Sequence, residues 1–411
     1  MGARRHYAVP RILYSAGLLG RLFTDICAVK GWPAIFGVVP PAALPASLRR
    51  LRERVPTGIP VRCITTFDWV GLQYAVRRSR TRNNSDLAAV NVWAGAAFCR
   101  CVVRHGIEDF DAAYAFNGAA LELLVEARRR GKGAILEQTN VPRSVEEELL
   151  QRERERFPDW ESVDPFSWNA QAFAQREADE WEQASLILCG SKFVVDGISR
   201  LGGPVDRCVV VPYGFLPVAE VGPRPSRARE LRVVTVGAVA LRKGTGYVLD
   251  AARALGSAAV FRLVGPVTVP STVVAGAPPN VEFVGVVPRS AVASHLSWAD
   301  VMLLPSVCEG SAVATYEALA HGVPVVCTPN TGSVVQDGVE GFVVPCGSVE
   351  AIVEAIARLA RDRELLAWLS SNAVRRAGDY DLDHYAARLV GAVAGRQSGA
   401  SATAPLRSGF C

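Results

Sequence analysis

Two segments in the second half of the chain have residue types that suit a phosphorylated ligand rich in hydroxyl groups. The first, residues 237–246, contains the adjacent cations Arg242 and Lys243, with Gly237 before them and Gly244 after them. Glycine lets a backbone approach a ligand closely, and paired cations make charge-assisted hydrogen bonds to a diphosphate. The spacing is not that of a Walker A loop. The segment predicts a diphosphate site, with a solvent-facing basic turn as the alternative.

The second segment, residues 305–322, contains two carboxylates eight positions apart, Glu309 and Glu317. We expect a helix that is capped by Ser311 and ends at Gly322. Both acids would then lie near a helix N-terminus, where they could accept hydrogen bonds from sugar hydroxyls. The alternatives are a surface acid stabilised by the helix dipole for Glu309 and an exposed helix residue for Glu317.

The spacing Glu309-x7-Glu317 inside P-S-x-x-E-G-S-A-x-x-x-Y-E-A-L-A-x-G-x-P-V resembles the signature of glycosyltransferase family 4. The turn at residues 241–244 is similar to that family's donor-phosphate motif. Residues 328–333 and 337–341 are similar to the run that follows it. The resemblance covers residues 233–345 and implies the GT-B fold, in which two Rossmann-like α/β domains face each other across a cleft, and a retaining mechanism.

The resemblance also implies roles for individual residues. Glu309, Arg242 and Lys243 would be catalytic, because Glu309 would contact the transferred sugar and the cations would hold the diphosphate in place of a metal. Glu317 would bind the ribose of the donor. The other donor-binding positions would be Gly310, Ser311, Ala312, Gly237 and Gly244. We expect no cofactor and no metal, with a UDP-sugar as the default co-substrate.

Three positions depart from the family pattern. Ala238 stands where many members have arginine, so Arg242 would carry that role. Ala312 stands where a glycine is usual. The expected strand end at residues 135–140 has Glu137 and no histidine. His105 and His6 are the alternative histidines.

Alternating strand and helix patterns should position these segments. Apolar runs predict strands near residues 61–65, 112–116, 134–137, 186–189 and 208–211, and again near 233–236, 261–265, 281–285, 301–305 and 324–327. Runs of this kind, separated by helices, indicate parallel sheets. The charged stretch at residues 143–183 predicts two exposed helices, broken near Pro158 and Pro165.

Given the resemblance, the expected organisation has five parts. Residues 1–212 form an acceptor-binding Rossmann-like domain, 213–230 a linker, and 231–380 a nucleotide-sugar-binding Rossmann-like domain. Residues 381–396 form a helix that crosses back to the first domain, and 397–411 a disordered tail.

The start of the chain allows two interpretations. Residues 12–14 read as a strand, followed by a glycine loop and a helix from Arg21. Gly17, Gly20, Arg21 and Glu137 would then face the cleft or the acceptor, because such sheets bind ligands at the carboxyl ends of their strands. The alternative is an amphipathic helix that contains Gly17 and Gly20.

Composition excludes several classes of protein. Of the 411 residues, 50% are hydrophobic and 21% charged, which is typical of a globular protein and not of a disordered one. No stretch of 18 or more apolar residues is present, and the nearest uncharged run, residues 31–48, contains four prolines, so we expect no membrane-spanning helix. No signal peptide is expected either. The ten cysteines form no C-x-x-C pair, so neither a zinc site nor a redox motif is indicated, and we expect a reducing cytoplasm.

Charge is distributed unevenly. Residues 1–105 carry sixteen Lys and Arg against four acids, so this part has a net charge of +12 within a total of +5. Such an excess favours an anionic partner, with an Arg-rich solvated surface as the alternative. Residues 45–55 form a short basic amphipathic segment that would suit peripheral contact with an anionic membrane at its inner face, with packing against the N-terminal sheet as the alternative. No nucleic-acid-binding motif is present, so nucleic acid is not expected as a partner.

Together these features predict a cytoplasmic retaining glycosyltransferase. It would move a sugar from a nucleoside diphosphate sugar to an acceptor of unknown kind, which could be a glycan, a lipid-linked molecule or a small molecule. The alternatives are another GT-B enzyme, such as a nucleotide-sugar epimerase, and a non-catalytic module that binds a nucleotide sugar or a lipid.

Overall fold

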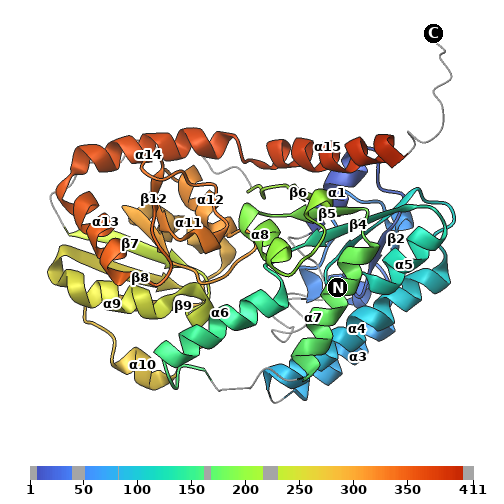
Figure 1. Ribbon diagram of the computed structural model, residues 1–411, viewed down its shortest axis with the longest axis horizontal. Helices are drawn as coiled ribbons and strands as arrows, with labels where there is room; N and C mark the ends of the chain where they lie inside the picture. The colour runs from blue at the N-terminus through green and yellow to red at the C-terminus, as the bar shows by residue number, and fades with distance from the viewer. Residues whose placement is uncertain (1–6, 39–50, 82, 162–167, 216–229, 401–411) are drawn as a thin grey trace, which may run out of the picture.

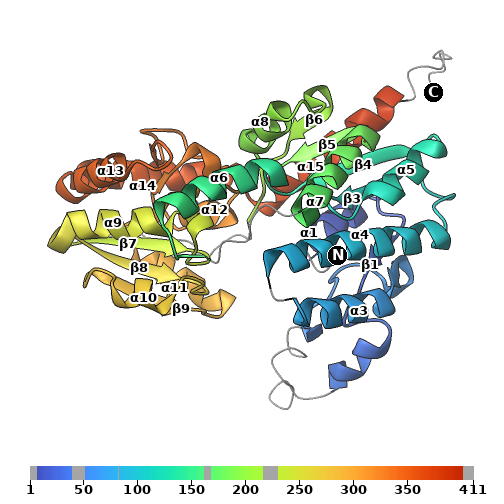
Figure 2. The same ribbon diagram turned by 60° about the horizontal axis from the view of Figure 1, so that its bottom comes forward.

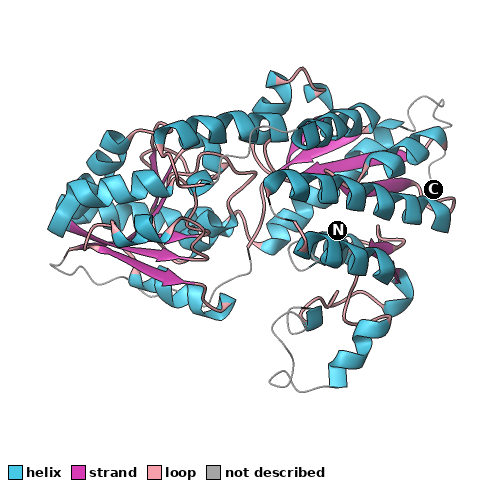
Figure 3. Ribbon diagram, turned by 90° about the horizontal axis from the view of Figure 1, so that it is seen from below, coloured by secondary structure: helices cyan, strands magenta, loops and turns pink. Residues whose placement is uncertain are grey.

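The computed structural model describes residues 7–38, 51–81, 83–161, 168–215 and 230–400. These residues form two parallel sheets of four and six strands, each covered by helices on both faces, and a separate two-stranded sheet (Figures 1 and 3). The predicted architecture of two Rossmann-like α/β domains is therefore confirmed.

The first domain contains the two smaller sheets, whose strands all pair in parallel. Its strands are β1 (Leu22–Thr24), β2 (Ile64–Thr66), β3 (Ala112–Phe116), β4 (Gly133–Gln138), β5 (Leu186–Cys189) and β6 (Cys208–Val210). Its helices are α1 (Ala8–Ser15), α3 (Asp68–Ser79), α4 (Asn84–His105), α5 (Leu121–Arg129), α6 (Arg143–Arg156), α7 (Trp168–Gln183) and α8 (Lys192–Arg200). Short 3-10 helices are η2 (Trp32–Val38), η4 (Val61–Cys63) and η5 (Val205–Arg207).

The second domain is built on one six-stranded sheet with the order β12-β11-β10-β7-β8-β9. Its strands are β7 (Leu231–Val236), β8 (Ala259–Val264), β9 (Val281–Gly285), β10 (Val301–Leu304), β11 (Val325–Cys327) and β12 (Gly341–Val343). Its helices are α9 (Thr245–Leu255), α10 (Ser271–Ala275), α11 (Arg289–Trp298), α12 (Val313–Ala320), α13 (Val349–Arg361) and α14 (Arg363–Gly378), with 3-10 turns η6 (Leu241–Lys243), η7 (Gly256–Ala258) and η8 (Pro329–Thr331). The central strands β10 and β11 are buried at every position, as their continuous apolar sequences require.

The start of the chain is a helix, so the predicted strand at residues 12–14 and the predicted helix from Arg21 are both wrong. Val9, Ile12 and Leu13 lie on one face of α1 and are buried against the last helix of the chain. Gly17, with φ +71°, follows the end of α1 and so does not weaken it. The first strand, β1, begins only at Leu22. The strand expected at 61–65 is likewise replaced by η4 and the shorter β2.

The charged helices α6 and α7 are not the exposed helices that the sequence predicts. Glu147 and Arg154 of α6 are buried and lie 2.7 Å apart, because their opposite charges pair within the packed interface. α6 also lies between the two domains (Figures 1 and 2). Its Glu153 accepts a 2.7 Å hydrogen bond from Tyr247 of α9, and Arg156 donates to the Gly347 carbonyl. A segment from the first half of the chain is thus fixed to the second domain.

The chain returns to the first domain through α15 (Leu382–Ala400), which continues the direction of α14 along one side of the molecule (Figure 1). Tyr385, Leu389 and Val393 of α15 are buried in a core cluster with α1, β4 and β5. The helix continues to Ala400, beyond the predicted start of a disordered tail at residue 397. Residues 401–411, like most of the expected linker and of the basic segment at 45–55, lie outside the described residues.

One helix in the described part of the chain, α4, has the length and apolar composition that could span a membrane. It packs against α3, α5 and α7, which is also how a core helix of a globular domain packs.

Candidate functional site

The order of strands in the second sheet brings the two chemistry-bearing segments together. β7 and β10 are neighbours, and the chain order runs outward from them in opposite directions. A ligand in an open parallel sheet binds beyond the carboxyl ends of the strands at such a reversal. Residues 237–246 follow β7 and residues 305–322 follow β10, and Val307 N–H donates to the Arg242 carbonyl at 2.9 Å.

The three residues expected to be catalytic contact one another at this edge. Lys243 Nζ lies 2.5 Å from Glu309 Oε1, and an Arg242 guanidinium nitrogen lies 3.3 Å from the same oxygen. The Lys243 and Glu309 side chains are 12% and 11% exposed, whereas Arg242 is 34% exposed. Burial acts to lower the pKa of Arg242, but the charges of Glu309 and Glu146 outweigh it and the pKa is raised. The site therefore holds two cations around one carboxylate.

Glycine is required on both sides of the cations. Gly237 has φ +145°, and a Cβ there would lie 3.2 Å from Cε of Lys243. Gly244 has φ +71°, and a Cβ there would lie 2.0 Å from the Pro305 carbonyl oxygen. Gly244 is also the N-cap of α9, so the amide groups of that helix begin directly after the cations. Cations, backbone amides and a helix N-terminus together suit a diphosphate.

The residue that caps α12, in the loop after β10, differs from the one that the sequence predicts. The N-cap of α12 is Ala312 and not Ser311, because the Ser311 hydroxyl is bonded to the Tyr316 hydroxyl at 2.7 Å. The Ala312 amide donates to the Thr331 carbonyl at 3.2 Å. Ser311 and Ala312 are both buried.

Glu317 is mostly covered and lies in the second turn of α12. Its Oε1 is 3.0 Å from Arg289 at the start of α11, and its side chain is 23% exposed. Burial raises the pKa of Glu317, and the charge of Arg289 opposes that shift. Arg289 is a site residue that the sequence did not indicate, because nothing in its local pattern ties it to a helix 28 positions away.

The first domain reaches the same loop. The Ser191 hydroxyl donates to the Gly310 carbonyl at 2.5 Å. A Cβ on Gly310 would lie 1.9 Å from the Thr139 carbonyl oxygen, so only glycine fits there. Asn140, beside Thr139, has a buried side-chain oxygen with no hydrogen-bond partner in the described structure. Glu309 and Gly310 thus lie where the two domains meet, and Thr139, Asn140 and Ser191 are site residues that sequence reasoning did not select.

Glu137 is buried inside the first domain, with 3% of its surface exposed. Its carboxylate accepts hydrogen bonds from the Tyr114 hydroxyl at 2.5 Å and from the Tyr213 hydroxyl at 3.1 Å. Both oxygens have partners within the domain, so the structure places Glu137 in the core and not on an open surface.

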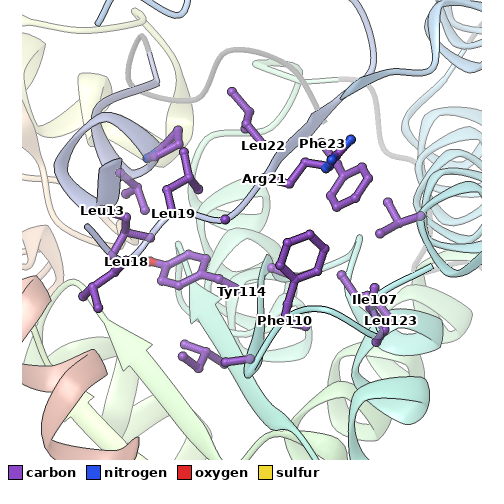
Figure 4. A pocket seen from close by; sticks show the side chains of 18 of the residues that line it. Leu13, Leu18, Leu19, Arg21, Leu22, Phe23, Ile107, Phe110, Tyr114 and Leu123 are labelled. Atoms are coloured by element: carbon purple, nitrogen blue, oxygen red, sulfur yellow. The ribbon is translucent and has the colours of Figure 1, made fainter. Parts of the chain in front are cut away.

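Gly17, Gly20 and Arg21 line a pocket of about 420 Å³ between β1 and β3 (Figure 4). They precede β1 and lie at its amino end, whereas the sequence predicted a loop at a carboxyl end. Gly20 owes its presence to close packing, since a Cβ would lie 2.7 Å from the Phe110 ring. Arg21 donates a 3.3 Å hydrogen bond to the Thr65 hydroxyl.

A buried carboxylate network supports the first domain's side of the site. Glu177 accepts hydrogen bonds from Asn117 at 2.8 Å, Gln138 at 2.9 Å and the Arg143 amide at 2.7 Å. These bonds fix the loops after β3 and β4 and the first residue of α6. Burial raises the pKa of Glu180, one turn along α7, to about 7. No sequence motif marks these acids, because their partners come from distant segments.

The two histidines considered from the sequence, His105 and His6, are not seen at the site formed by Arg242, Lys243 and Glu309 in the described part of the chain. His105 packs its ring against Phe23 in the first domain, 5.3 Å between centroids, and His6 lies outside the described residues. Within the described ranges, no group of three or more His, Cys, Asp or Glu side chains is placed to hold a metal ion.

Comparison with known sequences finds similarity chiefly to glycosyltransferases. Residues 230–362 match the family described as Glycosyl transferases group 1. The chain is 26% identical over 196 residues to the amylovoran biosynthesis glycosyltransferase AmsK of Erwinia amylovora, covering 44% of this chain and 48% of AmsK. It is 28% identical over 202 residues to the putative colanic acid biosynthesis glycosyltransferase WcaL of Escherichia coli, covering 44% and 49%. The chain thus spans about half the length of these curated relatives.

Comparison with solved structures covers nearly the whole chain. The structure of Anabaena Alr3699/HepE in complex with UDP-glucose superposes with a TM-score of 0.58 at 16% identity, covering 91% of this chain and 98% of that one. This likeness shows the GT-B fold. The sequence matches confirm the resemblance to glycosyltransferases, and the finer assignment to family 4 stays a prediction.

Proposed function

We propose that the protein is a retaining glycosyltransferase that needs no metal and uses a nucleoside diphosphate sugar as donor. The observation that carries this proposal is the convergence of Arg242 and Lys243 on Glu309 at the strand-order reversal of the second sheet. A cationic pair next to a helix N-terminus suits a diphosphate. Two carboxylates at the same sheet edge suit the hydroxyls of two sugars. The similarity to HepE, solved with UDP-glucose, favours a UDP-sugar.

Each of these residues would bind a different part of the donor. Lys243 and Arg242 would neutralise the negative charge that develops on the diphosphate as the glycosidic bond breaks. Preorganised charges of this kind stabilise a transition state more than a ground state. Glu317 would accept hydrogen bonds from the ribose, and the charge of Arg289 would oppose the rise in the Glu317 pKa that burial causes. Glu309 would contact the transferred sugar after the diphosphate takes over its two cations.

The acceptor would approach from the first domain. Thr139, Asn140 and Ser191 already contact the Glu309–Ser311 loop, and the unbonded Asn140 oxygen can accept a hydrogen bond from a sugar hydroxyl. The named activities of AmsK and WcaL favour a saccharide acceptor in polysaccharide biosynthesis. The pocket beside Arg21 lies at the gap between the two sheets of this domain, and we propose it as a second acceptor region.

Radiolabelled transfer tests the proposal directly. The full chain is first screened for thermal stabilisation by UDP-, GDP- and ADP-sugars, because a ligand that binds only the native state raises its stability. The stabilising donor is then supplied in labelled form with a saccharide extract. We expect labelled product that requires both substrates and is lost in Lys243→Met. Conversion of the donor to an epimer without transfer would establish the epimerase instead, and binding without any turnover would establish a non-catalytic module.

A further inference from the structure

An apolar stripe on helix α3 faces solvent. Trp69, Leu72 and Val76 follow one another at spacings of three and four, so they lie on one face of the helix. They are 68%, 41% and 42% exposed, whereas Val70 and Gly71 on the other side are buried. A surface helix normally turns its apolar stripe toward the core. In α3 a second apolar stripe points outward.

The 3-10 helix η2 extends this apolar surface. A Cβ on Gly31, the residue before η2, would lie 2.0 Å from the Asp68 carboxylate, so η2 starts beside the first residue of α3. Trp32 and Ile35 of η2 are 40% and 67% exposed. We refer to Trp32, Ile35, Trp69, Leu72 and Val76 together as the tryptophan face. Large apolar surfaces of this kind mark contact sites more often than free surface.

Exposed cations occur at the end of α3 and in η4, the 3-10 helix that precedes β2. Arg62 precedes β2, and Arg78 and Arg80 lie at the end of α3; all three are exposed. None of them forms an ion pair with a carboxylate in the described part of the chain. Arg77 stacks on Trp93 of α4, with its guanidinium 4.0 Å from the ring centroid. These arginines belong to the quarter of the chain whose net charge is +12.

We propose that the tryptophan face inserts into the headgroup region of an anionic lipid bilayer. Tryptophan is enriched at membrane interfaces, since its ring is apolar and its N–H is polar. Segments that lie in an interface combine exposed Trp and Leu side chains with Arg, and α3 carries Trp69 and Leu72 on its exposed face and Arg78 and Arg80 at its end. Each cation close to an anionic surface strengthens binding by roughly fivefold.

The tryptophan face lies away from the second domain. α3 lies on the outer side of the first domain, away from α9 and the second sheet (Figure 2). Attachment there need not block the loops after β7 and β10. The proposal does not depend on transferase activity, and it uses residues other than the basic segment at 45–55.

Sedimentation of the full chain with lipid vesicles tests the proposal. Vesicles of phosphatidylcholine alone are compared with vesicles that also contain phosphatidylglycerol, at low and at high salt. We expect binding to the anionic vesicles at low salt, and a loss of at least tenfold in the double variant W69S/L72S. Trp69 is 68% and Leu72 41% exposed, and neither belongs to a buried core, so the variant should fold normally.

Two further variants keep the outcome interpretable. W368S removes a tryptophan that is 51% exposed on α14 of the second domain, and we expect it to bind vesicles like the parent. R78E/R80E should lose the preference for anionic lipid and most of the salt dependence. Equal binding by W69S/L72S and the parent, or no anionic preference at low salt, would overturn the proposal. So would a parent that forms dimers, fails to bind vesicles, and becomes monomeric in W69S/L72S.

Discussion

Replacing Glu309 by glutamine tests whether the two cations beside it form the diphosphate site. In the free protein Lys243 and Arg242 share one Glu309 oxygen, at 2.5 and 3.3 Å. Glu309→Gln removes the charge and keeps the shape, so both cations lose their counter-ion in a largely buried position. Breaking a buried pair in this way costs about 3–5 kcal/mol. Arg242 is a third exposed and solvent screens it, so we expect about 2–4 kcal/mol.

This loss should appear as a lower melting temperature. One kcal/mol corresponds to about 2–4 °C for a domain of this size, so the free variant should melt roughly 4–16 °C below the parent. A bound diphosphate would supply the missing negative charge. Saturating UDP should therefore stabilise Glu309→Gln more than it stabilises the parent, so the difference between their melting temperatures should become smaller. Calorimetric melting with and without UDP, repeated with GDP and ADP, measures both effects.

The matched control is Glu282→Gln, which removes an ion pair with Arg262 on the same domain at 2.6 Å. The Glu282 side chain is 58% exposed, so its loss should cost less than about 1 kcal/mol and should not respond to UDP. A Glu309→Gln variant that melts like the parent would show that the two cations do not depend on this carboxylate. The diphosphate assignment is refuted if UDP, GDP and ADP all leave the difference in melting temperature between variant and parent unchanged.

Three other substitutions test the remaining parts of the site. Gly310→Ala places a Cβ 1.9 Å from the Thr139 carbonyl oxygen and should lower kcat/KM in a transfer assay by at least about tenfold. The control Gly378→Ala adds a Cβ that meets nothing within 4 Å, and its kcat/KM should match that of the parent. The pKa of Glu317 is raised by burial, so donor KM should rise as acid protonates this carboxylate. Glu317→Gln should show a raised KM without that pH dependence, and an unchanged acid limb would exclude Glu317 as the ribose ligand. The pKa of Glu180 is about 7 in the folded protein and about 4.3 in the unfolded chain. Between these two pH values the native state keeps a proton that the unfolded chain has lost, so the free energy of unfolding falls as pH rises. Glu180→Gln should reduce that fall by about 1–3 kcal/mol in urea titrations at pH 5 and pH 8; parallel pH profiles for variant and parent would contradict the pKa shift.

Local sequence was sufficient to predict the strands of the second domain. Its strands are short, continuous apolar runs, and a run such as Val301–Leu304 has no stable place except inside a sheet that is covered on both faces. The glycines and cations after β7 and the glutamates after β10 lie at the carboxyl ends of their strands by their place in the chain alone. That Arg242, Lys243 and Glu309 lie at one edge of the sheet could therefore be expected from the sequence, whereas the pairing of β7 with β10 brings them into contact.

Local sequence was not sufficient at the start of the chain. Val9, Ile12 and Leu13 have helical spacing, but the glycines after them favoured a strand followed by a loop. The helix forms because α15, from the other end of the chain, covers its apolar face. A pattern within ten residues cannot contain that partner.

Tertiary structure alone decided which charges meet. α6 has a sequence typical of a solvated helix, yet Glu147 and Arg154 are buried in it because α6 packs between the domains. Glu317 pairs with Arg289, and Gly310 contacts Thr139, across separations of 28 and 171 positions along the chain. Ion pairing and close packing act over a few ångströms of space and are insensitive to separation along the sequence. The sequence therefore determined the residue types at the donor site and their strand ends, and the folding of distant segments against one another determined their partners.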